Sequence, residues 1–131
     1  MKGIIQDKKI FSSCFEKMKK HTWTCMAPGC NDKCINSHVL QKNGILSQIA
    51  SNNHIIEMKP TTIWEIETHS LFKYQKIGIN DGFTFPGFCA FHDKEIFKEI
   101  ESTTVKFDSY KAQCLFSYRG LCQEMKRKDV A

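Results

Sequence analysis

Two short stretches, Cys25-Met26-Ala27-Pro28-Gly29-Cys30 and Cys89-Ala90-Phe91-His92, decide the fold of this chain. The first places two thiols around a Pro-Gly pair, which favours a tight turn. The second places a thiol and an imidazole three residues apart at the start of a predicted helix, so that both point to one side. Two such pairs of ligands from distant parts of a chain are typical of structural zinc sites. We therefore predict one structural zinc ion bound by Cys25, Cys30, Cys89 and His92.

Cys30 and Cys34 form a rival pair, because residues four apart on a helix also converge. We prefer Cys25 to Cys34 because the Pro-Gly turn suits a zinc knuckle, whereas Cys34 precedes a stretch that looks extended. A second alternative is that the four residues are buried and inert, as many free cysteines are. The number of ligand-type residues and their arrangement in two short pairs favour the zinc site.

Length and composition favour one small domain, residues 1–131, which could be the N-terminal part of a longer protein. The chain has 131 residues, 41% of them hydrophobic, with ten Phe to supply a core. No uncharged apolar stretch approaches the roughly 20 residues needed to span a bilayer. The first residues lack the apolar region and cleavage site of a signal peptide. We expect a cytoplasmic protein with no membrane partner.

The seven cysteines fit that compartment as metal ligands and core thiols. Cytosolic thiols are kept reduced, and an odd count fits disulfide pairing poorly. Cys14, Cys114 and Cys122 lie on apolar faces of predicted helices, and we expect them in the core.

The formal charge of +5 favours a polyanionic partner such as nucleic acid. Basic residues gather in two clusters, at Lys17, Lys19, Lys20 and His21 and at Lys126, Arg127 and Lys128. The alternative for either cluster is a solvated helix face or a charged tail.

Hydrophobic periodicity predicts an α+β fold with helices near both ends of the chain. Helices are expected over residues 8–20 and 93–101 and from Ser109 onward, with a brief strand within residues 34–40. Short β-prone runs at residues 55–58, 63–66, 72–77 and 83–85 predict a small antiparallel sheet. We therefore expect a zinc-stabilised, treble-clef-like core with an inserted antiparallel sheet and flanking N- and C-terminal helices.

Ser109 can cap the last helix, which carries one apolar stripe. The stripe consists of Cys114, Leu115, Tyr118, Leu121, Cys122 and Met125. It predicts that the helix docks on the core, joins a further domain or forms a homo-oligomer.

Three segments taken in order resemble the HNH nucleases of the His-Me finger class. They are Cys25-x4-Cys30, Ile35-Asn36-Ser37-His38 and Phe88-Cys89-Ala90-Phe91-His92-Asp93. Those nucleases combine a cysteine knuckle, a strand ending in a catalytic histidine, and a closing helix that opens with a Cys-x-x-Cys-His-like run. The resemblance covers roughly residues 25–101.

The resemblance implies a metal-dependent endonuclease that hydrolyses phosphodiester bonds in nucleic acid. His38 takes the place of the histidine that activates water. Asp93 falls where the family has a ligand of its catalytic metal, and a carboxylate there suits Mg²⁺ or Mn²⁺. Ser37 stands where the family often has an acidic residue or a histidine. The central asparagine of the family has three counterparts here, Asn52, Asn53 and Asn80.

Other readings of the same residues stay open. His38 could cap or pack at the start of a helix or ligate zinc, and Asp93 could be an ordinary helix cap. His21, His54 and His69 are read as surface or sheet residues. The chain as a whole could be a non-catalytic zinc module that binds nucleic acid or a protein partner, or a purely structural domain.

Overall fold

The computed structural model describes residues 2–19, 21–66 and 70–129. Within helix α1 (Lys2–Lys19), the side chains of Lys2, Phe15, Lys17, Met18 and Lys19 lie outside the description, as do Lys20 and His69 altogether. Most of the first predicted basic cluster therefore falls on residues whose side chains are not described. No helix in the described ranges is both long and apolar enough to cross a membrane.

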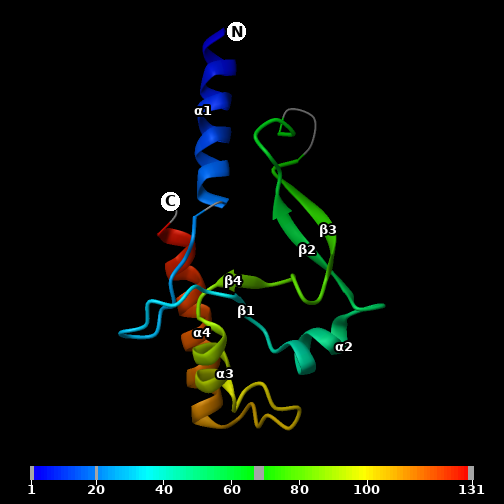
Figure 1. Ribbon diagram of the computed structural model, residues 1–131. Coiled ribbons are helices and arrows are strands. Elements are labelled where there is room, and N and C mark those ends of the chain that lie inside the picture. The colour runs from blue at the N-terminus through cyan, green and yellow to red at the C-terminus, as the bar shows by residue number, and fades with distance from the viewer. Residues whose placement is uncertain (1, 20, 67–69, 130–131) are drawn as a thin grey trace. The chain divides into compact units, whose positions relative to one another are not determined.

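Within the described residues the fold is α+β, with four α-helices and two small antiparallel sheets (Figure 1). It divides into two compact units. One comprises Met1–His21 and Ile56–Lys76, and the other comprises Thr22–Ile55 and Ile77–Ala131.

The larger unit contains a two-stranded sheet that leads directly into a helix. Strand β1 (Asn36–His38) pairs antiparallel with β4 (Thr84–Pro86), with Ser37 opposite Phe85. Helix α3 (Ala90–Phe97) follows β4 after three residues. The predicted helix over 93–101 is confirmed in type, but it begins and ends earlier than expected. A π-helical turn, η1 (Lys42–Leu46), and the short α2 (Ser47–Ile49) follow β1.

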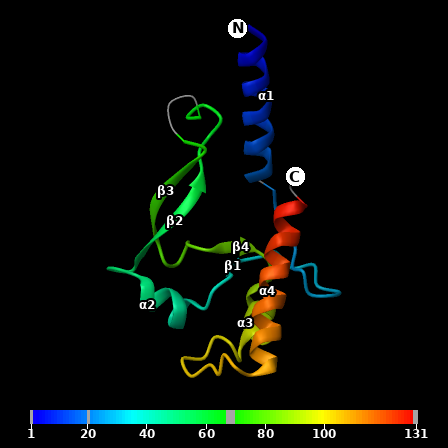
Figure 2. The ribbon, with the colours of Figure 1, turned by 180° about the vertical axis from the view of Figure 1, so that it is seen from behind.

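Helix α4 (Tyr110–Lys128) packs against α3, with the guanidinium of Arg119 4.1 Å from the ring centroid of Phe97. In the front view α3 lies in front of α4, and in the rear view α4 lies in front of α3 (Figures 1 and 2). Its predicted cap is confirmed, because Ser109 Oγ accepts a hydrogen bond of 3.1 Å from the N–H of Ala112. The aromatic rings of Phe88 and Phe97 pack edge to face in the core between these elements, with their centroids 5.3 Å apart. Cys25, Cys89 and Cys122 belong to the same buried cluster, whose further members are Ala27, Phe85, Ile100 and Ala112.

The apolar stripe predicted on α4 packs on the core only in part. Cys122 is buried in the core and Leu115 packs against it, and the ring centroid of Tyr118 lies 6.2 Å from those of Phe88 and Phe97. Tyr118, Leu121 and Met125 are 38, 58 and 50% exposed, and Cys114 is exposed as well. The buried face carries Ala112, Arg119, Cys122 and Lys126. Hydrophobic periodicity did not indicate this face, because Arg119 and Lys126 cover the core with their aliphatic stems. Their charged ends contact Glu101 and the carbonyl of Thr24.

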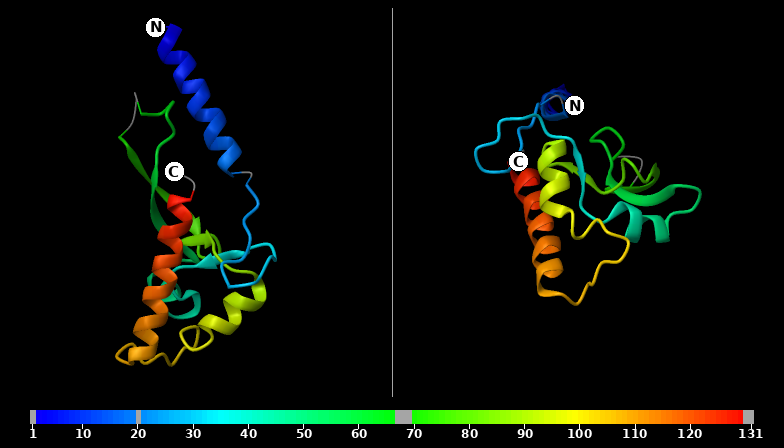
Figure 3. Two further views of the ribbon diagram at one scale, coloured as in Figure 1. Left: turned by 90° about the vertical axis from the view of Figure 1, so that its left-hand side faces the viewer. Right: turned by 60° about the horizontal axis from the view of Figure 1, so that its bottom comes forward.

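Strands β2 (His54–Pro60) and β3 (Phe72–Gly78) form the second two-stranded sheet, visible as a long ribbon in the left view of Figure 3. The inserted strands are therefore confirmed, but they make a separate ribbon rather than one sheet with β1 and β4. The strand predicted at 63–66 is wrong, because these residues form a turn. There, Glu65 Oε2 accepts hydrogen bonds of 2.9 Å from both the N–H and the hydroxyl of Thr62. These hydrogen bonds between Thr62 and Glu65 stabilise the turn and outweigh the β propensity of Ile63 and Trp64, which lie between them.

Candidate metal centre

The first two predicted ligands lie on a tight turn. The carbonyl of Ala27 accepts a hydrogen bond of 3.1 Å from the N–H of Cys30, and Gly29 has a φ of 75°. These features define a type II turn with Pro28 and Gly29 at its centre, because only the third position of that turn needs a positive φ. The Pro-Gly turn predicted from sequence is confirmed, and it brings the thiols of Cys25 and Cys30 to one side of the loop.

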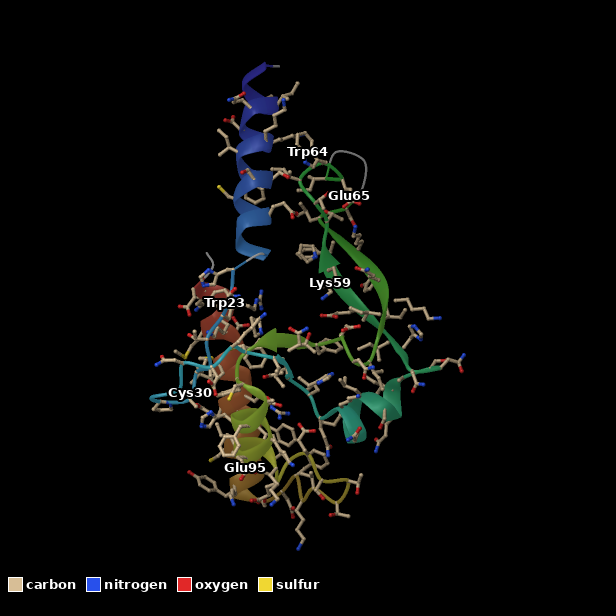
Figure 4. The ribbon with its side chains drawn as sticks, in the orientation of Figure 1. Trp23, Cys30, Lys59, Trp64, Glu65 and Glu95 are labelled. Atoms are coloured by element: carbon tan, nitrogen blue, oxygen red, sulfur yellow. The ribbon has the colours of Figure 1, made fainter. Side chains whose placement is uncertain are left out.

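The two arms of this knuckle pair antiparallel on either side of the turn. Thr24 and Lys33 form a bridge, and the N–H of Cys34 donates to Trp23 O at 3.0 Å. On the turn side of that bridge, the N–H of Cys25 donates to Asp32 O at 2.9 Å. The backbone therefore holds the position of Cys25 without help from the metal. Figure 4 labels Trp23 on one arm and Cys30 in the loop.

The other two ligands come from the first turn of α3. Cys89 is the N-cap, with φ of −73° and ψ of 164°, and its carbonyl accepts a hydrogen bond of 2.9 Å from the N–H of Asp93. Within that turn, Cys89 Sγ lies 3.2 Å from His92 Nδ1. The residue spacing predicted this convergence, because side chains three apart in a helix share a face.

Backbone hydrogen bonds bring the knuckle to the start of the helix. The N–H of Met26 donates to Gly87 O at 3.0 Å, and the N–H of Ile35 donates to Phe88 O at 2.8 Å. The knuckle is thereby fixed on both of its sides to the three residues that precede α3. These contacts link positions about sixty residues apart, and no local pattern in the sequence indicates them.

The four side chains meet in a geometry that fits zinc. Their ligand atoms all lie within 4.8 Å of one another. A tetrahedral site with Zn–S of about 2.3 Å and Zn–N of about 2.05 Å separates two sulfurs by about 3.8 Å and a sulfur from a nitrogen by about 3.6 Å. Cys30 Sγ and Cys89 Sγ are 3.9 Å apart, and Cys25 Sγ lies 3.6 Å from His92 Nδ1. A group of three thiols and one imidazole at these distances could hold a structural metal ion such as zinc.

The thiols of the cluster do not ionise with equal ease. Burial opposes ionisation of Cys25, but hydrogen bonds from the backbone of Cys89 and Ala27 and from the neighbouring thiols outweigh it, so its pKa is lowered. The pKa of Cys30 is raised to about 11, because burial and the thiols of Cys25 and Cys89 outweigh a backbone hydrogen bond at Asp32. Once one thiolate forms, it opposes the next. A divalent cation removes that opposition, because thiolate is the form that binds metal.

The structure therefore brings together the four residues predicted as ligands. Cys34, the rival, is outside this group. Its pKa is raised first by burial and also by the charges of Cys25 and Cys89, so it lies near the centre without joining it. Cys122 is buried as expected, whereas Cys14 and Cys114 are exposed and the prediction that they are core thiols is wrong. Both lie on helix faces that the rest of the described chain leaves uncovered.

His38 and Asp93, the two residues with predicted catalytic roles, occupy defined positions. His38 ends β1, and its Nε2 lies 2.8 Å from the carbonyl of Ile79. A carbonyl only accepts, so Nε2 carries the proton and Nδ1 keeps the lone pair. Asp93 lies in the first turn of α3, and its Oδ1 is buried with no hydrogen-bond partner among the described residues. In that same part of the chain, Cys25, Cys30, Cys89 and His92 are the one cluster of three or more Cys, His or acidic residues that could hold a metal.

The other residues named by the resemblance have structural positions. Ser37 is fully buried, and its Oγ accepts a hydrogen bond of 3.3 Å from the N–H of Phe88. It therefore serves the core beneath the sheet. Asn52 and Asn53 have φ values of 50° and 59° in a two-residue turn before β2. Hairpin turns that need a positive φ at both positions favour asparagine, so this turn accounts for both residues.

Sequence reasoning missed two cations on α4 that support the centre. Lys126 is 9% exposed, donates from Nζ to Thr24 O at 3.3 Å, and lies 4.6 Å from the centroid of the Trp23 ring. It therefore fixes the knuckle arm that leads into Cys25. Arg119 is fully buried over the ring of Phe97. The only local signal for the Lys126 contact is Trp23, two residues before Cys25. A tryptophan at that position does not indicate which lysine packs on its ring.

The fold and the site together define a class: an α+β chain with a Cys3His cluster between a knuckle and a helix N-terminus. Comparison with protein-family models, with curated proteins and with solved structures finds no match to this chain.

Proposed function

We propose that this chain is a zinc-stabilised module that binds a partner, in which the metal is structural. The observation that carries the proposal is the closed set of four protein ligands, Cys25, Cys30, Cys89 and His92. Catalytic zinc sites keep one position open for water or substrate, whereas structural sites fill all four with protein groups. Three thiolate ligands also need a reducing compartment, which supports the cytoplasm as the location.

Nucleic acid is the partner that the charge of the chain supports. The net charge is +5, and it is unevenly distributed. Residues 1–21 contain six lysines against one aspartate and one glutamate, whereas the unit with the metal centre is almost neutral. Of the second basic cluster, Lys126 is buried and Arg127 pairs with Glu124 at 2.8 Å. Phosphate contacts would therefore come mainly from α1.

Two measurements test the module. Protein purified without chelator should contain about one zinc per chain by elemental analysis. A fluorescent oligonucleotide should bind with an affinity that falls steeply with salt, and Lys8→Gln/Lys9→Gln should lower the slope of log K against log [salt] by roughly two. Lys106→Gln, an exposed change in the nearly neutral unit, is the control. A zinc-free, folded protein would refute the structural metal, and an unchanged salt slope in the double variant would refute the role of α1.

Nuclease activity is the second candidate, and a specific arrangement favours it. β1 ends in His38, pairs with β4, and β4 leads to α3 with Asp93 in its first turn. This is the strand–strand–helix order of the His-Me finger nucleases. The lone pair on His38 Nδ1 could accept a proton from water, and the unpaired Asp93 Oδ1 suits Mg²⁺ or Mn²⁺.

Cleavage of plasmid DNA or RNA with added Mg²⁺ or Mn²⁺ separates the two candidates. A nuclease should lose roughly a hundred- to ten-thousand-fold in rate in His38→Ala, with zinc content unchanged. Asp93→Ala should also lose activity, with partial recovery at high Mn²⁺ if Asp93 is a ligand. Binding without cleavage, or cleavage that His38→Ala leaves intact, would reject a nuclease at this site.

A further inference from the structure

The described side chains of the unit formed by Met1–His21 and Ile56–Lys76 form no apolar core of their own. Among its described side chains, Thr61 is the one that is buried. The buried hydrophobic residues all belong to the other unit. Eleven large hydrophobic side chains of this unit are between 41 and 79% exposed: Ile4, Ile5, Ile10, Phe11, Ile56, Met58, Trp64, Ile66, Leu71, Phe72 and Tyr74.

The exposed residues of the β2–β3 ribbon share one face. Backbone hydrogen bonds at its two ends, from Thr61 to Leu71 and from Ile79 to Asn53, fix one register along the whole ribbon. In that register, even-numbered residues of both strands point to the same side. This side carries Ile56, Met58, Phe72 and Tyr74, with Lys76 further along β3. The other side carries the ion pair of Glu57 and Lys59 at 3.1 Å, so the ribbon has one mainly apolar and one polar face.

Among the described residues, helix α1 contacts the ribbon at its tip. Lys8 Nζ lies 5.8 Å from the centroid of the Trp64 ring, which Figure 4 labels at that tip. A cavity of about 220 Å³ separates the helix from the tip, and it is lined mostly by apolar residues. Phe11 and Ser12 line it from the helix, and Pro60, Thr61, Thr62, Ile63 and Ile66 line it from the ribbon. This contact leaves the apolar sides of both elements exposed.

Such a unit needs further burial to be stable. A two-stranded hairpin by itself is at best marginally stable in water, and most of the stability of a helix in a protein comes from packing of its apolar face. If the eleven side chains offer roughly 80 Å² each, about half of what large side chains can bury, they offer about 900 Å². A stable interface takes about 800 Å² from each partner. The exposed apolar surface is therefore sufficient for a dimer.

We propose that this surface joins two copies of the chain in a two-fold dimer, with α1 of one copy on the ribbon face of its partner. Charge selects this arrangement. Residues 1–21 carry a formal charge of +4, from six lysines, one aspartate and one glutamate, whereas residues 56–76 are neutral, with three lysines and three glutamates. Two α1 helices repel each other, but α1 and a neutral ribbon do not. A two-fold axis forms both contacts at once, because each copy supplies both surfaces.

An acidic protein fits the observations less well, because it would attract the lysines of α1 but would leave the apolar ribbon face, with Met58 and Tyr74, exposed to water. An anionic lipid surface would attract the lysines and bury part of the apolar surface, so vesicle binding is one outcome of the test below. A second copy covers both surfaces. The inference does not depend on the metal, whose ligands all lie in the other unit.

Analytical ultracentrifugation of the full chain over a range of concentrations tests the dimer. Met58→Glu and Tyr74→Glu should each weaken dimerisation by about a hundredfold, because a two-fold interface contains every substitution twice and about tenfold is expected per copy. Both side chains are mostly exposed in one copy, 56 and 79%, so the variants should fold. Leu121→Glu is the matched control, because its side chain is 58% exposed on the other unit.

The wild-type chain and Leu121→Glu should dimerise with equal affinity. Amide NMR spectra of the zinc unit should coincide in all the variants, which separates loss of the dimer from loss of the fold. A wild-type chain that stays monomeric at every concentration would overturn the proposal, as would dissociation by Leu121→Glu and not by Met58→Glu. Binding of the monomer to phosphatidylglycerol vesicles with no dimer in solution would also overturn it, in favour of a lipid surface.

Discussion

Removing the charge of Glu101 should destabilise the protein more than removing Arg119, its partner. Arg119 Nη1 lies 2.6 Å from Glu101 Oε1, and the two side chains are 1 and 32% exposed. No nitrogen of the guanidinium has a well-aligned hydrogen bond among the described residues. The buried charge therefore depends on Glu101 and on the ring of Phe97, whose centroid is 4.1 Å away.

The magnitudes follow from this asymmetry. Glu101→Gln leaves a buried cation without its countercharge, which should cost about 3–5 kcal/mol of unfolding free energy. Arg119→Met keeps most of the buried volume, and the remaining carboxylate still reaches water, so about 1–3 kcal/mol is expected. The double variant, Glu101→Gln with Arg119→Met, should lose less unfolding free energy than the sum of the two single losses, because it leaves no unpaired buried charge. Glu124→Gln is the control, since it breaks an exposed pair with Arg127 and should change stability by about 0.5 kcal/mol or less.

Urea unfolding of the zinc-loaded protein measures these differences, with equal m-values taken as evidence that the same transition is followed. The reasoning would be refuted if Glu101→Gln cost no more than Glu124→Gln. It would also fail if the two changes at Arg119 and Glu101 were simply additive, because independent sites show no coupling.

Three further predictions concern the site, a helix and the ribbon tip. Cys25→Ser should lose the metal and yield little soluble protein, since structural zinc supplies on the order of 10 kcal/mol of folding free energy. Cys34→Ser should keep about one zinc per chain by elemental analysis, and the opposite result would move the site to Cys34. Gly120→Ala should raise the unfolding free energy by about 0.5–1 kcal/mol, because a Cβ at this helical position meets no atom within 4 Å; a loss of stability would show a close neighbour there. Hydrogen bonds from the Thr62 N–H, and then Lys73, lower the pKa of Glu65 to about 2. The stability that Glu65 contributes should therefore be present above pH of about 4.5 and be lost as the pH falls towards 2, and NMR titration of its carboxyl group should show a midpoint near 2.

The sequence by itself determined the local features of this protein. Pro28-Gly29 sets a turn that aims two thiols at one point, and Cys89 with His92 follows from helical spacing; both depend only on nearby backbone geometry. The cap at Ser109 and the two inserted strands were also predictable, because capping and β-alternation are local. The likeness to a nuclease comes from the order of these local features, and the roles of His38 and Asp93 stay predictions.

The tertiary structure alone decided which surfaces meet. The backbone bonds from Met26 and Ile35 to the residues before α3 join the two ligand pairs. The buried side of α4 carries Arg119 and Lys126 beside Cys122, whereas Leu121 and Met125 of the apolar stripe stay exposed. Hydropathy counts a cation as polar, but its cost of burial depends on whether Glu101 or Thr24 stands opposite its charged end. That partner is fixed only when distant segments pack together, so no pattern along the chain could indicate it.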